Sequence, residues 1–204
     1  MAGLRSLLVA PRLYVERIDG GGTLPVAAMI VVGAALSEAI ESLASLFYLA
    51  SAVRSITVTP VAVALAAAAP VVLLGVVWAL TSVLIQLVAV AAGGWGSFGQ
   101  TVKLVGLSFL PYLLGSTVAA IATFLALTGA VDGNVETTAA FVRALNSDVL
   151  FRVGRFTKVG FVAWTTILWA TTGAASLDVP LWKTVPPALI PGGLLAWLTV
   201  TPVL

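Results

Sequence analysis

Apolar residues gather in five long runs, separated by short segments that hold most of the charged residues. The runs lie at about 24–51, 61–92, 102–128, 156–172 and 188–203. A helix that crosses a bilayer needs about 20 predominantly apolar residues. The pattern therefore predicts an all-α, polytopic membrane protein, built as a bundle of five transmembrane helices.

Several prolines indicate where these helices begin or bend. The second run is too long for one upright span, so we expect it to tilt or bend, and Pro70 gives a cause because it removes a backbone hydrogen bond. We expect a kink near Pro111 in the third run for the same reason. The fifth run is short and starts with Pro186 and Pro187, so its full passage across the bilayer stays open.

Two further segments have the pattern of helices that lie along a surface. The apolar core of residues 1–18 is only Leu7 to Ala10, too short for a cleaved signal peptide. We expect an interfacial helix there, with apolar side chains towards lipid and three arginines towards headgroups. Between the third and fourth runs, Phe141, Leu145 and Val149 recur every four residues. This spacing predicts a short amphipathic helix that lies on the membrane or on the protein.

The composition agrees with this class and excludes several functions. The chain is 60% hydrophobic and 9% charged, whereas soluble domains are about 25% charged. It contains no cysteine and no histidine, which removes thiol nucleophiles, Ser–His pairs and histidine metal sites. We therefore expect a non-enzymatic protein with no cofactor and no metal, and no basic, aromatic-rich surface for nucleic acid.

The orientation follows from the charges that flank the first run. Arg5, Arg12 and Arg17 precede it, and Arg54 follows it. Counted over the whole chain, the basic residues divide five against five between the two sides, so we let the first helix decide. The positive-inside rule then predicts a cytoplasmic N-terminus, and five spans place the C-terminus outside.

The first run contains two acids, Glu38 and Glu41, which share one helix face because they are three residues apart. Gly33, Ser37 and Ser45 continue this face with Glu41 at intervals of four. Small and polar residues at this spacing favour close packing between helices, and we consider a homodimer that uses this stripe.

Two interpretations of the acids stay open. A carboxylate inside a bilayer must face the protein interior, pair or stay protonated. The acids are either a proton or cation site, or they form hydrogen bonds that fix helix packing. Arg54 is too far along the helix to pair with them, so Gln86, with Ser82 one turn before it, is the expected partner.

A glycine-rich segment separates the second and third runs. Its residues are Gly93, Gly94, Trp95, Gly96, Ser97 and Phe98. Together with Gly99 it matches G-x-G-x-x-G, but the preceding run is far too long for a strand and the next acid is Asp132, so we reject a dinucleotide site. We expect a tight turn whose Trp95 and Phe98 lie at the membrane interface.

These glycines also carry a family resemblance. Gly93-Gly94-Trp95-Gly96-Ser97-Phe98-Gly99-Gln100-Thr101, followed by Pro111-Tyr112, resembles the "GG-x-G-S-F … P" region of Yip1-domain membrane proteins. Pro11 with Tyr14, then Gly21-Gly22 and Pro25, look like the start of prokaryotic members. The resemblance covers residues 11–201 in layout and implies a five-span bundle with a cytoplasmic N-terminus, in the cell membrane of a prokaryote.

The resemblance implies less about activity. Eukaryotic Yip1 relatives act in vesicle traffic and associate with small Rab GTPases, but their acidic-aromatic segment ahead of the first span is not visible here. We therefore expect a membrane-organising scaffold whose partner is the lipid bilayer, with a homodimer and a protein partner still to be identified. The alternative is a small ion- or proton-coupled transporter that uses Glu38 and Glu41.

Overall fold

The computed structural model describes residues 23–53, 56–130 and 137–201, and all regular structure in these ranges is helical. The helices are α3 (Thr23–Ala52), α4 (Pro60–Ala91), α5 (Phe98–Leu107), α6 (Leu110–Ala130), α7 (Thr138–Ser147), α8 (Val149–Leu177) and α9 (Leu181–Val200). This confirms the predicted all-α class. The interfacial helix predicted for residues 1–18 lies outside the described residues.

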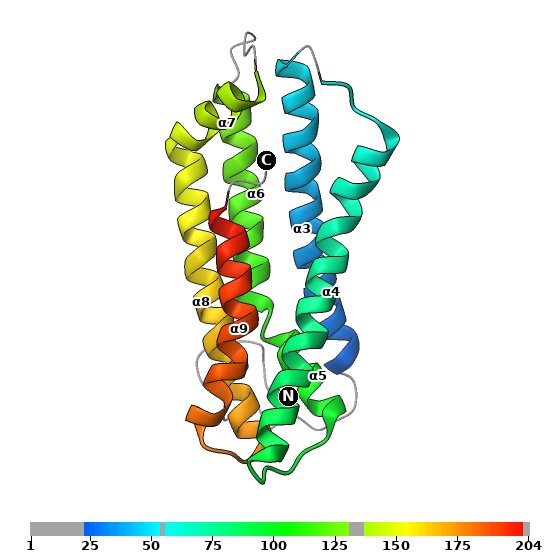
Figure 1. The fold of residues 1–204 in the computed structure, drawn as a ribbon, viewed down its shortest axis with the longest axis vertical. Coiled ribbons are helices and arrows are strands. Elements are labelled where there is room, and N and C mark those ends of the chain that lie inside the picture. The colour runs from blue at the N-terminus through cyan, green and yellow to red at the C-terminus, as the bar shows by residue number, and fades with distance from the viewer. Residues whose placement is uncertain (1–22, 54–55, 131–136, 202–204) are drawn as a thin grey trace.

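The long helices run side by side along the molecule and alternate in direction (Figure 1). The α4–α5 and α8–α9 connections lie at the end where α3 begins, and α7 lies at the opposite end (Figure 1). Among the described residues, three stretches are long and apolar enough to cross a membrane: Leu24–Ala52, Pro60–Ala91 and Phe98–Gly129. They correspond to the first three predicted spans, and the fourth and fifth stay predictions.

The kink expected near Pro111 is a full break between two helices. α5 ends at Leu107 and α6 begins at Leu110, so Ser108 and Phe109 form the junction. The Ser108 hydroxyl donates to the Leu104 carbonyl at 2.7 Å, which satisfies one of the last carbonyl groups of α5. Phe109 is fully buried, and its ring lies 5.0 Å from the ring of Trp169 on α8. The break thus anchors α6 to α8.

The helices that correspond to the fourth and fifth predicted runs, α8 and α9, begin earlier than the sequence predicts. α8 begins at Val149 because Asp148 caps it, with the Phe151 N–H donating to the Asp148 carboxylate at 3.0 Å. α9 begins at Leu181 and contains Pro186 and Pro187 rather than starting with them. Proline is tolerated inside helices that neighbouring helices surround. Lys158 consequently lies inside α8, in the first half of that helix, and not in a loop.

The amphipathic helix predicted between the third and fourth runs is α7, and its apolar face packs on the protein. Phe141 and Leu145 are buried in a cluster with Leu49, Leu127 and Phe151. Val149 does not belong to this face, because α7 ends at Ser147 and Val149 opens α8 with its side chain exposed.

Glycines allow α6 and α8 to approach closely. A Cβ atom on Gly115 of α6 would lie 2.6 Å from the Phe161 Cβ, and one on Gly154 of α8 would lie 2.6 Å from the Ala122 Cβ. In a bilayer the hydrophobic effect does not drive helices together, so association depends on close packing. Small residues at helix crossings allow this packing because the two backbones can approach. The face of α8 between these crossings is therefore held against α6.

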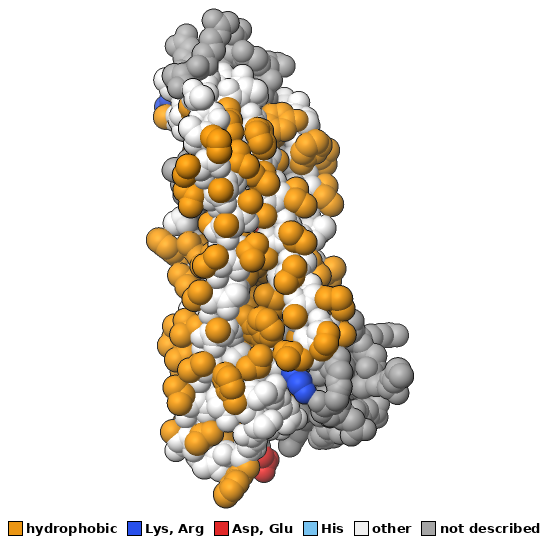
Figure 2. Space-filling view, turned by 90° about the vertical axis from the view of Figure 1, so that its right-hand side faces the viewer, with side chains coloured by type: hydrophobic (Ala, Val, Ile, Leu, Met, Phe, Trp, Pro, Cys, Tyr) orange, Lys and Arg blue, Asp and Glu red, His pale blue; other side chains and the backbone are white. Residues whose placement is uncertain are grey.

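The outer surface is apolar along most of its length. Figure 2 shows hydrophobic side chains spread over one whole face, with the few charged side chains near its ends. Met29, Ile40, Leu65 and Ile121 are examples of exposed apolar side chains on three different helices. Such a surface is stable in hydrocarbon and not in water, as expected for a helical membrane protein.

The close crossing of α6 and α8 gives a first prediction. Gly154→Ala should destabilise the bundle by about 1–3 kcal/mol, because the added methyl group overlaps Ala122. Gly160→Ala, in the same helix, has open space around it and should be neutral or stabilising by up to about 1 kcal/mol. Thermal unfolding in detergent measures both. Equal melting temperatures for the two variants would contradict this crossing.

Candidate functional site

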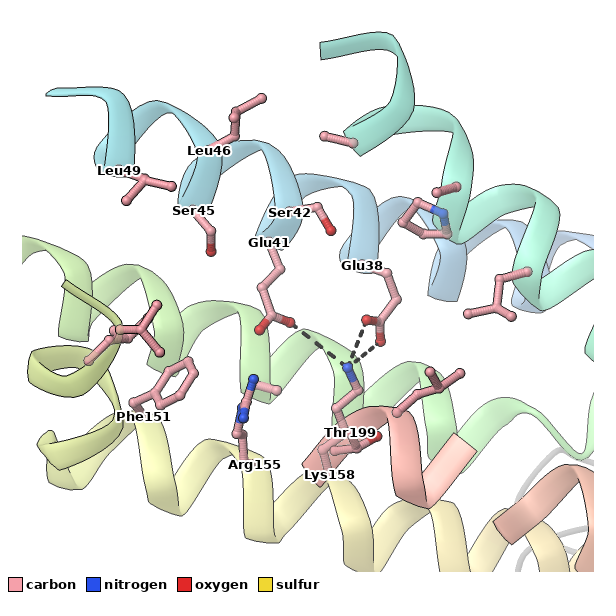
Figure 3. Close-up of a pocket in the computed structure, with 18 of the residues that line it drawn as sticks. Glu38, Glu41, Ser42, Ser45, Leu46, Leu49, Phe151, Arg155, Lys158 and Thr199 are labelled. Atoms are coloured by element: carbon pink, nitrogen blue, oxygen red, sulfur yellow. Dashed lines mark hydrogen bonds and ion pairs between the residues drawn. The ribbon is translucent and has the colours of Figure 1, made fainter. Parts of the chain in front are cut away.

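Glu38 and Glu41 face the interior of the bundle from the middle of α3 (Figure 3). Each carboxylate reaches towards α6 and α8, and each side chain retains only 18% of its exposed surface. Their spacing of three residues places both acids on one face, as the sequence predicts. The two acids therefore meet the same neighbouring helices.

Lys158 of α8 lies between the two acids. Its Nζ atom is 2.6 Å from Glu38 Oε1 and donates a hydrogen bond to Glu38 Oε2 at 2.7 Å. The same Nζ atom is 3.9 Å from Glu41 Oε2. The lysine side chain is 9% exposed, so this is a buried ion pair that joins the first and fourth long helices. Figure 3 shows the three side chains converging.

Helix α6 supplies two hydroxyl groups to the same acids. Tyr112 donates to Glu38 Oε1 at 3.0 Å, and Thr123 donates to Glu41 Oε1 at 2.9 Å. Glu38 therefore has partners for both oxygen atoms. Glu41 has one satisfied oxygen, whereas its buried Oε2 accepts no hydrogen bond from the residues that the structure describes. Glu38 thus has hydrogen-bond partners for both carboxylate oxygens, whereas Glu41 has a partner for one.

Arg155 brings the cluster to electrical balance. It precedes Lys158 by one turn of α8, so two cations face two carboxylates. Its guanidinium lies 4.4 Å from the centre of the Phe151 ring and donates a long, 3.4 Å hydrogen bond to the Val200 carbonyl. Unpaired charge is costly away from water, so this one-to-one balance is what allows four ionisable groups to share an apolar bundle.

The expected partners of the acids, Gln86 and Ser82, lie elsewhere, and this prediction was wrong. The Gln86 amide donates to the Gly96 carbonyl at 3.2 Å and accepts from the Thr101 hydroxyl at 2.7 Å. The Ser82 hydroxyl donates to the Trp78 carbonyl within its own helix. α3 and α4 are antiparallel, so the C-terminal part of α4 lies beside the start of α3 and not beside its middle (Figure 1).

The stripe of small residues on α3 packs within the chain. A Cβ atom on Gly33 would lie 3.4 Å from the Leu113 side chain, and the Ser37 hydroxyl lies 3.2 Å from that of Thr117. Both contacts are with α6. Ser45 faces a cavity that is described below. Gly33 and Ser37 thus belong to the α3–α6 contact within the chain, and the homodimer stays a prediction.

The glycine-rich segment forms the turn between α4 and α5, against the end of α8. Gly93 has a φ of 85°, a conformation that favours glycine. A Cβ atom on Gly94 would lie 2.6 Å from the Leu177 carbonyl, and one on Gly96 would lie 2.6 Å from the Leu177 side chain. Ser97 caps α5, and Phe98 begins that helix. Trp95 is 86% exposed.

The sequence-based reasoning missed Lys158, Tyr112 and Thr123 as members of the cluster. A signal for Lys158 exists, because it falls inside the apolar run 156–172 and an ionisable residue in such a run needs a partner. The two hydroxyl residues carry no such signal, since Thr and Tyr are common in membrane helices for other reasons. Only the packing of α6 against α3 identifies them.

The fold and the buried charge cluster define a helical bundle for a membrane environment, and comparison with known families identifies its kind. The Yip1 domain matches residues 5–201, nearly the whole chain. The chain therefore belongs to the Yip1 domain family, which confirms the resemblance carried by the glycine-rich segment. Comparisons with curated proteins and with solved structures give no match.

The ion pair gives a second prediction. Lys158→Met should destabilise the protein by about 3–5 kcal/mol, because it leaves two buried carboxylates without their shared cation. Arg152→Met removes an exposed charge from the same helix and should change the stability by less than about 0.5 kcal/mol. Thermal unfolding in detergent again provides the measurement.

A double-mutant cycle separates pairing from general damage. Glu38→Gln combined with Lys158→Met should recover part of the loss, because the uncompensated charge at position 38 is gone. If the losses of the two single variants simply add in the double variant, the two residues are not coupled and the buried ion pair is wrong.

Proposed function

We propose that the protein is a non-enzymatic, membrane-organising member of the Yip1 domain family, a scaffold that resides in a prokaryotic cell membrane. It crosses the bilayer five times, with α3, α4, the α5–α6 pair, α8 and α9 as its spans. Its N-terminus is cytoplasmic and its C-terminus is outside. The family assignment and the alternating, apolar helices support this proposal.

The engagement of Glu38 carries the proposal. Both of its oxygens have partners, with Lys158 bridging them and Tyr112 adding a third contact. A carboxylate that carries protons or cations must lose its protein partners in each cycle. Here, release of Glu38 would leave Lys158 buried with only the more distant Glu41, which is costly. The pair is therefore better suited to holding α3, α6 and α8 together.

One end of the bundle is suited to contact with lipid headgroups. Trp95 and Trp182 are both largely exposed, and the Lys183 Nζ atom lies 4.6 Å from the centre of the Trp182 ring. The backbone N–H of Trp95 donates to the Leu177 carbonyl, which brings the α4–α5 and α8–α9 connections together. Tryptophan and lysine side chains at a helix end typically anchor it at the membrane interface. In the proposed orientation this end faces the cytoplasm.

The orientation is our third prediction. Reporter proteins that are active only in the cytoplasm or only outside, fused to the N- and C-terminal ends, should give opposite signals. Reversal of both signals would show that the orientation is inverted. The same signal from both ends would exclude an odd number of spans and with it the five-span assignment.

A flux assay separates the scaffold from the transporter alternative and is our fourth prediction. Proteoliposomes that carry a pH-sensitive dye should show no proton flux above that of empty liposomes when a potential is applied. The scaffold proposal fails if a flux appears that Glu38→Gln abolishes and Arg152→Gln does not. Lithium, sodium and potassium gradients test cation coupling in the same vesicles.

A further inference from the structure

A cavity of about 600 Å³ lies beside the charge cluster. It separates the N-terminal half of α4 from the other helices. Residues 60–73 of α4 include no buried residue, whereas Leu74 and Val77, further along, are fully buried. Figure 1 accordingly shows α4 leaning away from α3 towards its N-terminal end. The helix closes one end of the bundle and leaves a hollow at the other.

The walls of this cavity differ in chemistry. The α4 side is apolar and is formed by Ala62, Ala66, Ala69, Pro70 and Leu73. The opposite side contains the charge cluster, with polar side chains of α3 beside it (Figure 3). The volume falls within the roughly 300–1,000 Å³ typical of small-ligand sites. A ligand that fits both walls must have a hydrocarbon part and a charged part.

Two oppositely charged groups in the cavity wall, Glu41 Oε2 and the Arg155 guanidinium, have no short hydrogen bond to a described residue. Glu41 Oε2 is buried without a hydrogen bond, and its distance from Lys158, 3.9 Å, is too long for one. Among the described residues, Arg155 donates one hydrogen bond, at 3.4 Å to the Val200 carbonyl, and contacts the Phe151 ring, although guanidinium offers five donors. Both side chains line the same cavity. A ligand in this cavity could therefore supply an N–H donor for Glu41 and an anionic acceptor for Arg155.

We propose that this cavity binds a phospholipid whose headgroup carries both a phosphate and a primary ammonium group. The ammonium donates to Glu41 Oε2, and the phosphate accepts from Arg155. Acyl chain lies along the alanine face of α4. A trimethylammonium headgroup has no N–H to donate. A glycerol headgroup can donate a hydroxyl but has no positive charge to balance Glu41, and it adds a net negative charge to the cavity. The site therefore selects the aminophospholipid over choline and glycerol lipids.

This inference goes beyond the proposed scaffold function and does not depend on it. Lipid binding is measured as a retained mass, whereas the scaffold proposal is tested by flux and topology. A protein that binds the lipid and conducts protons would overturn only the scaffold, and one that does neither would overturn only the lipid site.

The first experiment is native mass spectrometry of the full chain in detergent. Phosphatidylethanolamine, phosphatidylcholine and phosphatidylglycerol with identical acyl chains are added separately at equal concentrations. One phosphatidylethanolamine should be retained about tenfold more strongly than either of the others, as one charged hydrogen bond predicts. Glu41→Gln and Arg155→Gln should each remove most of this preference, and Arg152→Gln, on the exposed face of the same helix, should preserve it.

The second experiment blocks the cavity without touching a charge. Ala66→Phe places a large side chain in the cavity wall, and Ala68→Phe places the same side chain on a part of α4 that does not line it. The first variant should abolish the retained lipid and the second should not. A photoreactive acyl chain on phosphatidylethanolamine should likewise label residue 66 or 69 in preference to the exposed Leu65 and Val72.

Three outcomes would overturn the proposal. Equal retention of the three lipids would show that hydrocarbon alone fills the cavity. Equal labelling of both faces of α4 would show that the bound lipid belongs to the annulus around the protein. Loss of binding in Ala68→Phe as well as in Ala66→Phe, with both variants folded by thermal unfolding, would place the lipid outside the cavity.

Discussion

The requirement that buried charge be neutralised governs the arrangement of this protein. Glu38 and Glu41 lie in the middle of α3, inside an apolar bundle where an unpaired carboxylate is costly, and Lys158 on α8 lies beside both. The contact joins helices that are 120 residues apart in the sequence. It fixes both the rotation of α3 and the height of α8, because a turn of either helix in the wrong direction would leave a charge unpaired.

The bundle is closely packed at one interface and open at another. Gly115 and Gly154 let α6 and α8 come together, and the buried Phe109 and Trp169 lock the lower part of the same interface. α4 packs tightly only from Leu74 onward, so its first half stands away from the bundle. The charge cluster thus belongs to two environments, a packed seam at Glu38 and a cavity wall at Glu41 and Arg155. The bundle can be rigid and still contain a cavity, because Glu38 holds the packed helices together while Glu41 and Arg155 line the cavity.

Periodicity and composition predicted the features that depend on one segment at a time. The all-helical class, the first three candidate spans, the amphipathic α7 and the turn at Gly93–Gly96 are of this kind. Helix ends were less predictable. Asp148 caps α8 earlier than hydrophobicity suggests, and α9 tolerates Pro186 and Pro187 inside the helix. Capping and proline effects depend on hydrogen bonds that hydropathy does not measure.

The sequence by itself determined that the chain needs an apolar environment, that its backbone crosses it as helices, and that Glu38 and Glu41 need partners. Tertiary structure decided that the partner is Lys158 with Tyr112 and Thr123, and not Gln86. The reason is physical. Hydropathy and spacing describe which residues share a face of one helix, whereas pairing across helices depends on their relative rotation and height. Those follow from the close approach at glycines in α6 and α8, which no single segment encodes.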